Sequence, residues 1–152
     1  MKDTSAIPLY LMPWPQALRL TADSTLSLPL YISSVRAGFP SPADDYRANS
    51  IDLNSYISSN PTATFLVKVE GDSMIGAHIV PGDLAVVDRS KTAKSGDIVL
   101  AYVNGDFTIK RYELRKDGAY LIAENPTYMP LRITEADAGR IWGTVVGTVR
   151  TL

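Results

Sequence analysis

Ser73 and Lys110 have the types and surroundings that nucleophilic catalysis needs. Ser73 lies in the segment Gly71-Asp72-Ser73-Met74, directly after an apolar run that ends near residue 70. A glycine before it lets the chain turn sharply and leaves the serine at the end of a rigid element. The backbone N–H groups of Asp72 and Ser73 are then candidate oxyanion donors. The same four residues also suit an ordinary polar turn, so the serine by itself does not decide the chemistry.

A serine hydroxyl is a weak nucleophile until a base accepts its proton. Lys110 lies inside an apolar run, and alternation places it on one face with Thr108, Tyr112 and Leu114. That face is largely apolar, and burial there can lower a lysine pKa from about 10.4 by up to roughly 3 to 5 units. The neutral amine could then accept the serine proton. The alternative is that Lys110 extends its ammonium group to solvent.

His78, the single histidine, is the other candidate base. It follows Ser73 by five residues, close to a turn, and no carboxylate lies at a spacing that indicates a triad. We therefore expect a surface or loop histidine. The chain has no cysteine, which excludes disulfides, thiol nucleophiles and zinc sites built on cysteine. No cofactor or metal is expected.

The elements that position these residues are predicted from apolar runs of strand length after residue 62. The runs cover residues 64–70, 84–88, 98–103, 107–114, 120–123 and 141–149. Asn104-Gly105 and Asp117-Gly118 supply positive φ angles for two-residue turns, so the fourth run should pair antiparallel with both of its neighbours. The sequence therefore predicts a mainly β domain over residues 63–152.

Residues 1–62 differ in composition, with most of the ten prolines but one of the ten glycines. They lack a sustained period, and only residues 41–60 favour a short helix or two, with Ser41 or Asn49 as the N-cap. We expect a flexible N-terminal arm with weak local structure.

The charge balance argues against direct DNA binding. Fifteen basic and sixteen acidic residues give a net charge of −1 without a basic run, so sequence-independent attraction to phosphates is missing. The apolar stretch 7–14 is short and interrupted by proline, which does not favour a signal peptide or a membrane span. We expect a cytoplasmic protein that binds no membrane and no specific DNA sequence.

Four motifs together resemble the LexA/UmuD family of self-cleaving peptidases, with Ser-Lys catalysis. They are Gly71-Asp-Ser-Met74, Pro81-Gly-Asp-Leu84, Ser95-Gly-Asp-Ile-Val99 and Phe107-Thr-Ile-Lys-Arg111, and the resemblance covers residues 37–148. It implies a twisted β-sheet catalytic domain that dimerises, with Ser73 as nucleophile and Lys110, 37 positions later, as general base.

The segment Val35-Arg-Ala-Gly-Phe-Pro-Ser-Pro42 resembles the self-cleavage site of that family, with Ala37-Gly38 as the scissile pair. Small side chains suit a shallow pocket beside a nucleophile. Alanine stands where UmuD proper has another small residue, and it is common at LexA-type sites. The expected division is an arm over residues 1–37 that cleavage removes, a remaining arm over 38–62, and the peptidase and dimerisation domain over 63–152. The arm is long enough for cleavage in cis, and cleavage in trans stays open.

Within the family, the short arm and the segments Phe39-Pro-Ser-Pro-Ala-Asp-Asp-Tyr46 and Ile51-Asp-Leu-Asn54 resemble the UmuD branch. LexA-like repressors carry a helix-turn-helix domain before the cleavage site, and no amphipathic helix pair is found here. The resemblance implies an accessory subunit of an error-prone, Y-family translesion polymerase of the UmuC type. It also implies a homodimer, with cleavage stimulated by a RecA filament on single-stranded DNA, in the SOS response.

Two other classes remain open at the level of sequence. One is a non-catalytic dimeric binding module in which Ser73 and Lys110 are idle. The other is a trans-acting Ser-Lys protease that cuts foreign chains.

Overall fold

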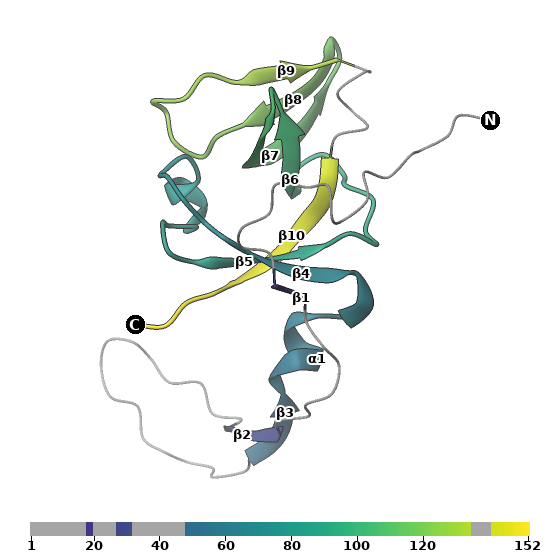
Figure 1. Cartoon of the computed structure of the whole chain (residues 1–152), viewed down its shortest axis with the longest axis vertical. Coiled ribbons are helices and arrows are strands. Elements are labelled where there is room, and N and C mark those ends of the chain that lie inside the picture. The colour runs from purple at the N-terminus through teal and green to yellow at the C-terminus, as the bar shows by residue number, and fades with distance from the viewer. Residues whose placement is uncertain (1–17, 20–26, 32–47, 135–140) are drawn as a thin grey trace, which may run out of the picture.

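The computed structural model describes residues 18–19, 27–31, 48–134 and 141–152. Their main element is one twisted, antiparallel sheet of eight strands in the order β1-β4-β5-β10-β6-β7-β8-β9 (Figure 1). Its strands are β1 Leu18–Arg19, β4 Thr64–Lys68, β5 Leu84–Asp88, β6 Ile98–Val103, β7 Asp106–Arg115, β8 Gly118–Ile122, β9 Leu131–Ile133 and β10 Ile141–Val149. The predicted mainly β class is confirmed.

The central strands follow the predicted apolar runs closely. Three of them, β5, β6 and β10, have the predicted bounds, whereas β4 ends at Lys68, two residues early. The chain continues beside β5 after that point, because Val69 donates its N–H to the carbonyl of Asp83 at 2.8 Å. This contact keeps the segment before Ser73 attached to the sheet.

Strand β7 pairs with both β6 and β8, as predicted from the two turn motifs. In the first turn Asn104 has φ 53° and Gly105 has φ 91°, which are the positive angles that a two-residue hairpin favours. The second turn is displaced by one residue from the prediction. Arg115 pairs with Gly118, so the turn residues are 116 and 117, and Gly118, with φ 143°, begins β8.

The C-terminal strand β10 lies between β5 and β6 and pairs antiparallel with both. Two core clusters are built around these strands. One contains Val69, Met74, Ile79 and Ala85, and the other contains Val99, Ala101, Leu121 and Ile133. Because β10 closes the centre of the sheet, the core that supports the nucleophile depends on a pairing between distant parts of the chain.

The described parts of the arm contain more structure than the sequence predicted. Strand β1 pairs with the edge of β4, and β2 Ser27–Tyr31 pairs with β3 Ala48–Asp52 in a separate two-stranded sheet. The short helix α1, Leu53–Ile57, is confirmed, but its N-cap is Asp52, whose carboxylate accepts from the N–H groups of residues 54 and 55. The proposed cap Asn49 lies in β3 instead.

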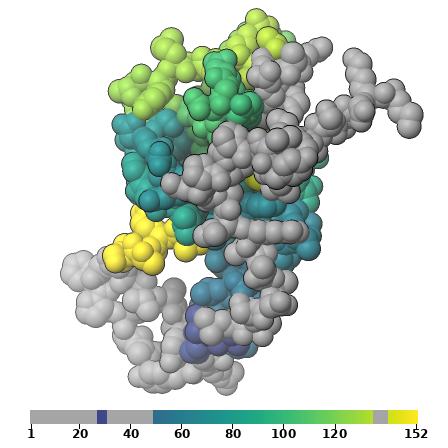
Figure 2. Space-filling view, in the orientation of Figure 1, coloured from purple at the N-terminus to yellow at the C-terminus, as the bar shows by residue number. Residues whose placement is uncertain are grey.

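Ser41 and the scissile pair Ala37-Gly38 lie outside the described residues, in the connection between β2 and β3. Short 3-10 turns at Pro61–Ala63 and Ile75–Ala77 complete the elements of the described residues. Within those residues, no helix is both long enough and apolar enough to span a membrane. Figure 2 shows strands β7 to β9 in green at the upper part of one face and the C-terminal residues in yellow at the surface.

Candidate active site

The turn that carries Ser73 begins directly after the sheet. Gly71 has φ 75°, an angle that disfavours other residues, so the sharp turn predicted from this glycine is present. Met74, on the other side of Ser73, is buried in the core cluster that includes Val69. The serine is therefore held between a glycine turn and a buried anchor.

The structure brings Ser73 and Lys110 together. The Lys110 Nζ lies 2.8 Å from the Ser73 Oγ, although the two residues are 37 positions apart. Nζ also contacts Thr108 Oγ1 at 2.7 Å and the carbonyl oxygen of Ile109 at 3.0 Å. The nitrogen therefore has three hydrogen-bond contacts.

Burial lowers the pKa of Lys110 from its ordinary value of 10.5. Removal of the amine from water disfavours the ammonium form, which is the cause predicted from the apolar face. A neutral amine has two N–H donors and one lone pair. The Ile109 carbonyl and the Thr108 hydroxyl can accept those two N–H groups, which leaves the lone pair for the proton of Ser73. The arrangement can therefore deprotonate the serine in the step where it attacks a carbonyl.

The backbone N–H groups of Asp72 and Ser73 donate to no other residue in the described part of the chain. Both groups are thus available to an oxyanion at the turn. Asp72 is exposed and Ser73 is half-buried, so a substrate carbonyl can approach this side.

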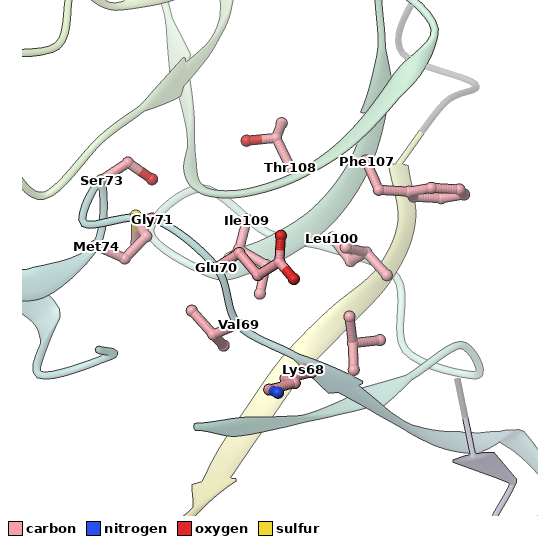
Figure 3. A pocket seen from close by; sticks show the side chains of 11 residues that line it. Lys68, Val69, Glu70, Gly71, Ser73, Met74, Leu100, Phe107, Thr108 and Ile109 are labelled. Carbon is pink, nitrogen blue, oxygen red and sulfur yellow. The ribbon is translucent and has the colours of Figure 1, made fainter. Parts of the chain in front are cut away.

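A cleft of about 210 Å³ begins beside Ser73 and runs between the end of β4 and the start of β7. Its lining consists of Val67, Lys68, Val69, Glu70, Gly71, Ser73, Met74, Leu100, Phe107, Thr108 and Ile109. Figure 3 shows Ser73 on its turn at one end, with Thr108 facing it from β7. The walls are polar and apolar in similar measure, and the chain at and just after the end of β4 lies along one side. The cleft can receive an extended peptide with small side chains at the serine.

Two contacts that sequence reasoning missed hold the serine turn from the loop after β8. Asn125 donates from Nδ2 to the carbonyl oxygen of Asp72 at 3.0 Å, and Tyr128 donates its hydroxyl to the Asp72 carboxylate. The sequence pattern placed Thr108 on the same strand face as Lys110, but it did not predict the contact between the Thr108 hydroxyl and the Lys110 amine. The only local signal at Asn125 is its place before Pro126, which indicates a turn and not a contact 53 positions away.

His78 lies in an exposed loop, as expected, with φ 61°. Its carbonyl accepts from Arg150 at 3.0 Å, and its imidazole makes no hydrogen bond to Ser73. Of the two candidate bases, the lysine is therefore the one that contacts the serine.

The comparison with known families agrees with this geometry. Residues 29–146 match the model of the family described as Peptidase S24-like. The chain belongs to this family. Protein ImpA of Salmonella typhimurium is 43% identical over 112 residues, which are 73% of this chain and 77% of ImpA. Protein MucA of Escherichia coli is 40% identical over 121 residues, covering 78% and 82% of the two chains.

LexA repressor 1 of Geobacter sulfurreducens is 41% identical over 135 residues, covering 86% of this chain and 64% of the repressor. As a member of the Peptidase S24-like family, the chain is a self-cleaving serine peptidase with Ser-Lys catalysis and a UmuD-like protein of SOS mutagenesis. The resemblance expected from the four motifs is confirmed.

Proposed function

We propose that Ser73 and Lys110 cleave the chain's own Ala37–Gly38 bond, with the N–H groups of Asp72 and Ser73 as the oxyanion hole. The observation that carries this proposal is the contact of 2.8 Å between Lys110 Nζ and Ser73 Oγ at one end of the cleft. Burial at this site disfavours the charged ammonium form of Lys110. A lysine without a catalytic role would not be expected to lie so close to a serine at such a site.

The reaction has two steps. Neutral Lys110 takes the proton of Ser73 as Oγ attacks the carbonyl carbon of Ala37, and the N–H donors stabilise the oxyanion. The intermediate collapses when Lys110 returns the proton to the departing amine of Gly38. Lys110 then takes a proton from a water molecule as the water oxygen attacks the ester carbon of Ala37. When the ester bond breaks, Lys110 gives this proton to Ser73 Oγ, which restores the serine and the neutral amine. The products are residues 1–37 with a new carboxylate and residues 38–152 with a new amino terminus.

The arm that holds the scissile pair is part of the same molecule, so its effective concentration at the cleft is high. A tethered substrate lets even a modestly activated serine react. A trans-acting protease that cuts foreign chains would need a cleft with its own affinity for peptides. The small cleft of about 210 Å³ favours a tethered substrate.

A mixing experiment separates these alternatives. A Ser73→Ala chain with a size tag supplies an intact arm without a nucleophile, and the untagged wild-type chain supplies the enzyme. Cleavage of the wild type alone indicates attack in cis, whereas cleavage of the tagged chain indicates attack in trans. Rapid turnover of a free peptide that spans residues 33–42 would support the trans-acting protease and contradict the tethered account.

For the biological role, we propose that the protein works in the cytoplasm as a homodimeric accessory subunit of a UmuC-like Y-family DNA polymerase. A RecA filament on single-stranded DNA would stimulate cleavage by binding the arm conformation that reaches Ser73, which raises its population without supplying a chemical group. The family membership and the likeness to ImpA and MucA support this role. The net charge of −1 supports action through proteins and not through direct DNA contact.

The test uses both forms of the protein. RecA with single-stranded DNA and a slowly hydrolysed nucleotide should accelerate cleavage of the wild type and leave Ser73→Ala intact. Residues 38–152 should then co-purify with the Y-family polymerase as a dimer in greater yield than the Ser73→Ala chain does. A polymerase that binds both forms equally, with no cleavage under either condition, would instead indicate a non-catalytic dimeric binding module.

A further inference from the structure

One buried side chain holds the turn of the nucleophile from the loop after β8. Asn125 is 7% exposed, and its Nδ2 donates to the carbonyl oxygen of Asp72 at 3.0 Å. The loop itself is fixed beside the turn, because Gly76 donates its N–H to the carbonyl of Glu124 at 2.8 Å. Asn125 therefore approaches the nucleophile turn from a rigid neighbour and not from a free surface loop.

The orientation of the Asn125 amide is determined by its other contacts. Its Oδ1 accepts from the backbone N–H of Thr127 at 3.1 Å and from the Thr127 hydroxyl at 2.8 Å. A backbone N–H can only donate, so the oxygen of the amide must face Thr127. The NH2 group must then face Asp72, where it meets a carbonyl that can only accept.

The Asp72 carbonyl belongs to the same peptide unit as the N–H of Ser73. The described chain has no cis peptide bond, so in this planar unit the carbonyl and the N–H point in opposite directions. A hydrogen bond that fixes the carbonyl also fixes the direction of the N–H. Donation to the carbonyl further polarises the peptide unit and makes its N–H a better donor.

We infer that Asn125 is a positioning residue for the oxyanion hole, because its amide orients and polarises the peptide between Asp72 and Ser73 through the Asp72 carbonyl. This inference rests on the proposed function, since it needs the Ser73 N–H to bind the oxyanion. Asn125 makes no hydrogen bond to the Ser73 hydroxyl or to Lys110. Its effect is therefore on the charge that develops in the transition state and not on the proton transfer to the base.

The simpler role for Asn125 would be to brace its own loop through Thr127. Asn125→Asp separates the two roles, because a carboxylate keeps the acceptor for Thr127 and loses the donor to Asp72. Asn125→Ala removes both. Asn104→Asp makes the same chemical change in the β6–β7 turn, where Asp-Gly is as suitable as Asn-Gly, and serves as the matched control.

The experiment measures the rate of self-cleavage of the full chain against pH, together with thermal unfolding. We expect Asn125→Asp and Asn125→Ala to lower the plateau rate by about 10- to 100-fold, less than the roughly 10²- to 10³-fold that loss of a direct oxyanion donor costs. The pH midpoint of Asn125→Ala should equal that of the wild type, because the pair of Ser73 and Lys110 is unchanged. Asn104→Asp should match the wild type in both.

Two outcomes would overturn the inference while the proposed function stands. One is that Asn125→Asp cleaves at the wild-type plateau rate. Asn125 would then only stabilise its own loop through Thr127. The other is a shifted pH midpoint in Asn125→Ala, which would place the effect on Lys110. A wild-type chain that stays uncut, like Ser73→Ala, would instead contradict the proposed function, and the positioning role of Asn125 would fail with it.

Discussion

Lys110 lies directly opposite Val99 in the ladder between β6 and β7. Paired residues of neighbouring strands share a face, and Val99 is fully buried in the core. The amine of Lys110 therefore leaves the sheet from an apolar neighbourhood and finds polar partners only at its tip. This placement explains in physical terms why burial lowers the pKa of a lysine whose nitrogen still has three hydrogen-bond contacts.

The pH dependence of self-cleavage follows from this shift. Lys110 must be neutral to accept the serine proton, so the rate should rise by about tenfold per pH unit and then level off. Because burial lowers the lysine pKa below 10.5, the half-maximal rate should fall below that pH. Intact mass measured against time at a series of pH values gives the pH at which the self-cleavage rate is half-maximal. A half-maximal rate at or above pH 10.5 would contradict the desolvated base.

The hydroxyl of Thr108 should orient the amine of Lys110, since the two atoms lie 2.7 Å apart. Thr108→Val keeps the shape and removes the hydroxyl, so one N–H of the neutral amine loses its acceptor. We expect the plateau rate to fall by about tenfold, the loss of roughly 1.4 kcal/mol that one neutral hydrogen bond represents. Thr148→Val, an exposed change on β10, is the control, and equal rates in the two variants would reject the role.

Gly76 lies close to the loop after β8, because its N–H donates to the carbonyl of Glu124 at 2.8 Å. A Cβ there would lie 2.6 Å from the carbonyl oxygen of Glu124, so this backbone atom would have to shift, which is costlier than moving a flexible side chain. Gly76→Ala should therefore cost about 1–3 kcal/mol of unfolding free energy and slow self-cleavage, because it pushes the loop from the turn. Denaturant unfolding and cleavage rates test both effects.

Gly147→Ala is the matched control for this change, because a Cβ at that position meets nothing within 4 Å. Its unfolding free energy and cleavage rate should stay near those of the wild type. If Gly76→Ala is as stable as Gly147→Ala and cuts as fast, the close contact with Glu124 does not constrain the turn.

Asp83 and Arg150 join β5 to the C-terminal segment. The Arg150 guanidinium donates to the buried Asp83 carboxylate, and this bond, with a second one from the Val80 N–H, lowers the pKa of Asp83 from 3.8 to about 2. The ionised form is favoured on folding, so its stabilisation is complete above the unfolded value and is lost as pH falls from 3.8 towards 2.

Asp83→Asn should therefore be less stable than the wild type at neutral pH. The difference in unfolding free energy should shrink as pH falls through that window, because the wild-type carboxylate becomes neutral as well. Urea unfolding at about pH 7, 4 and 2.5 measures the difference. A gap that stays constant down to the lowest pH would show that the charge of Asp83 contributes nothing.

Much of the site could be predicted because its signals are local. The glycine turn before Ser73 and the alternation around Lys110 are each contained in a few residues, and the family motifs set their separation. Strand β7 and its two partners followed from turn chemistry in the same way. These two local patterns identified Ser73 and Lys110, the two residues that are in contact in the structure.

The rest depends on pairings between distant segments. Strand β1 has two residues and β2 contains Pro29, so neither has a readable period. Strand β10 lies between β5 and β6, which are distant from it in sequence. No local sequence pattern around β10 therefore predicts its position in the sheet. Asn125 gave no catalytic signal either, because its partner at Asp72 is reached only once β8 and β4 belong to the same sheet.

The most direct test of the central claim is intact mass after incubation of the purified chain at about pH 10, where the lowered pKa of Lys110 increases the fraction of neutral amine. The account predicts two fragments that meet between Ala37 and Gly38, formed by the wild type and absent from Ser73→Ala and Lys110→Ala. A wild-type chain that stays whole at this pH, and also in the presence of an activated RecA filament, would contradict it. Fragments that appear equally in the Ser73→Ala control would contradict it as well.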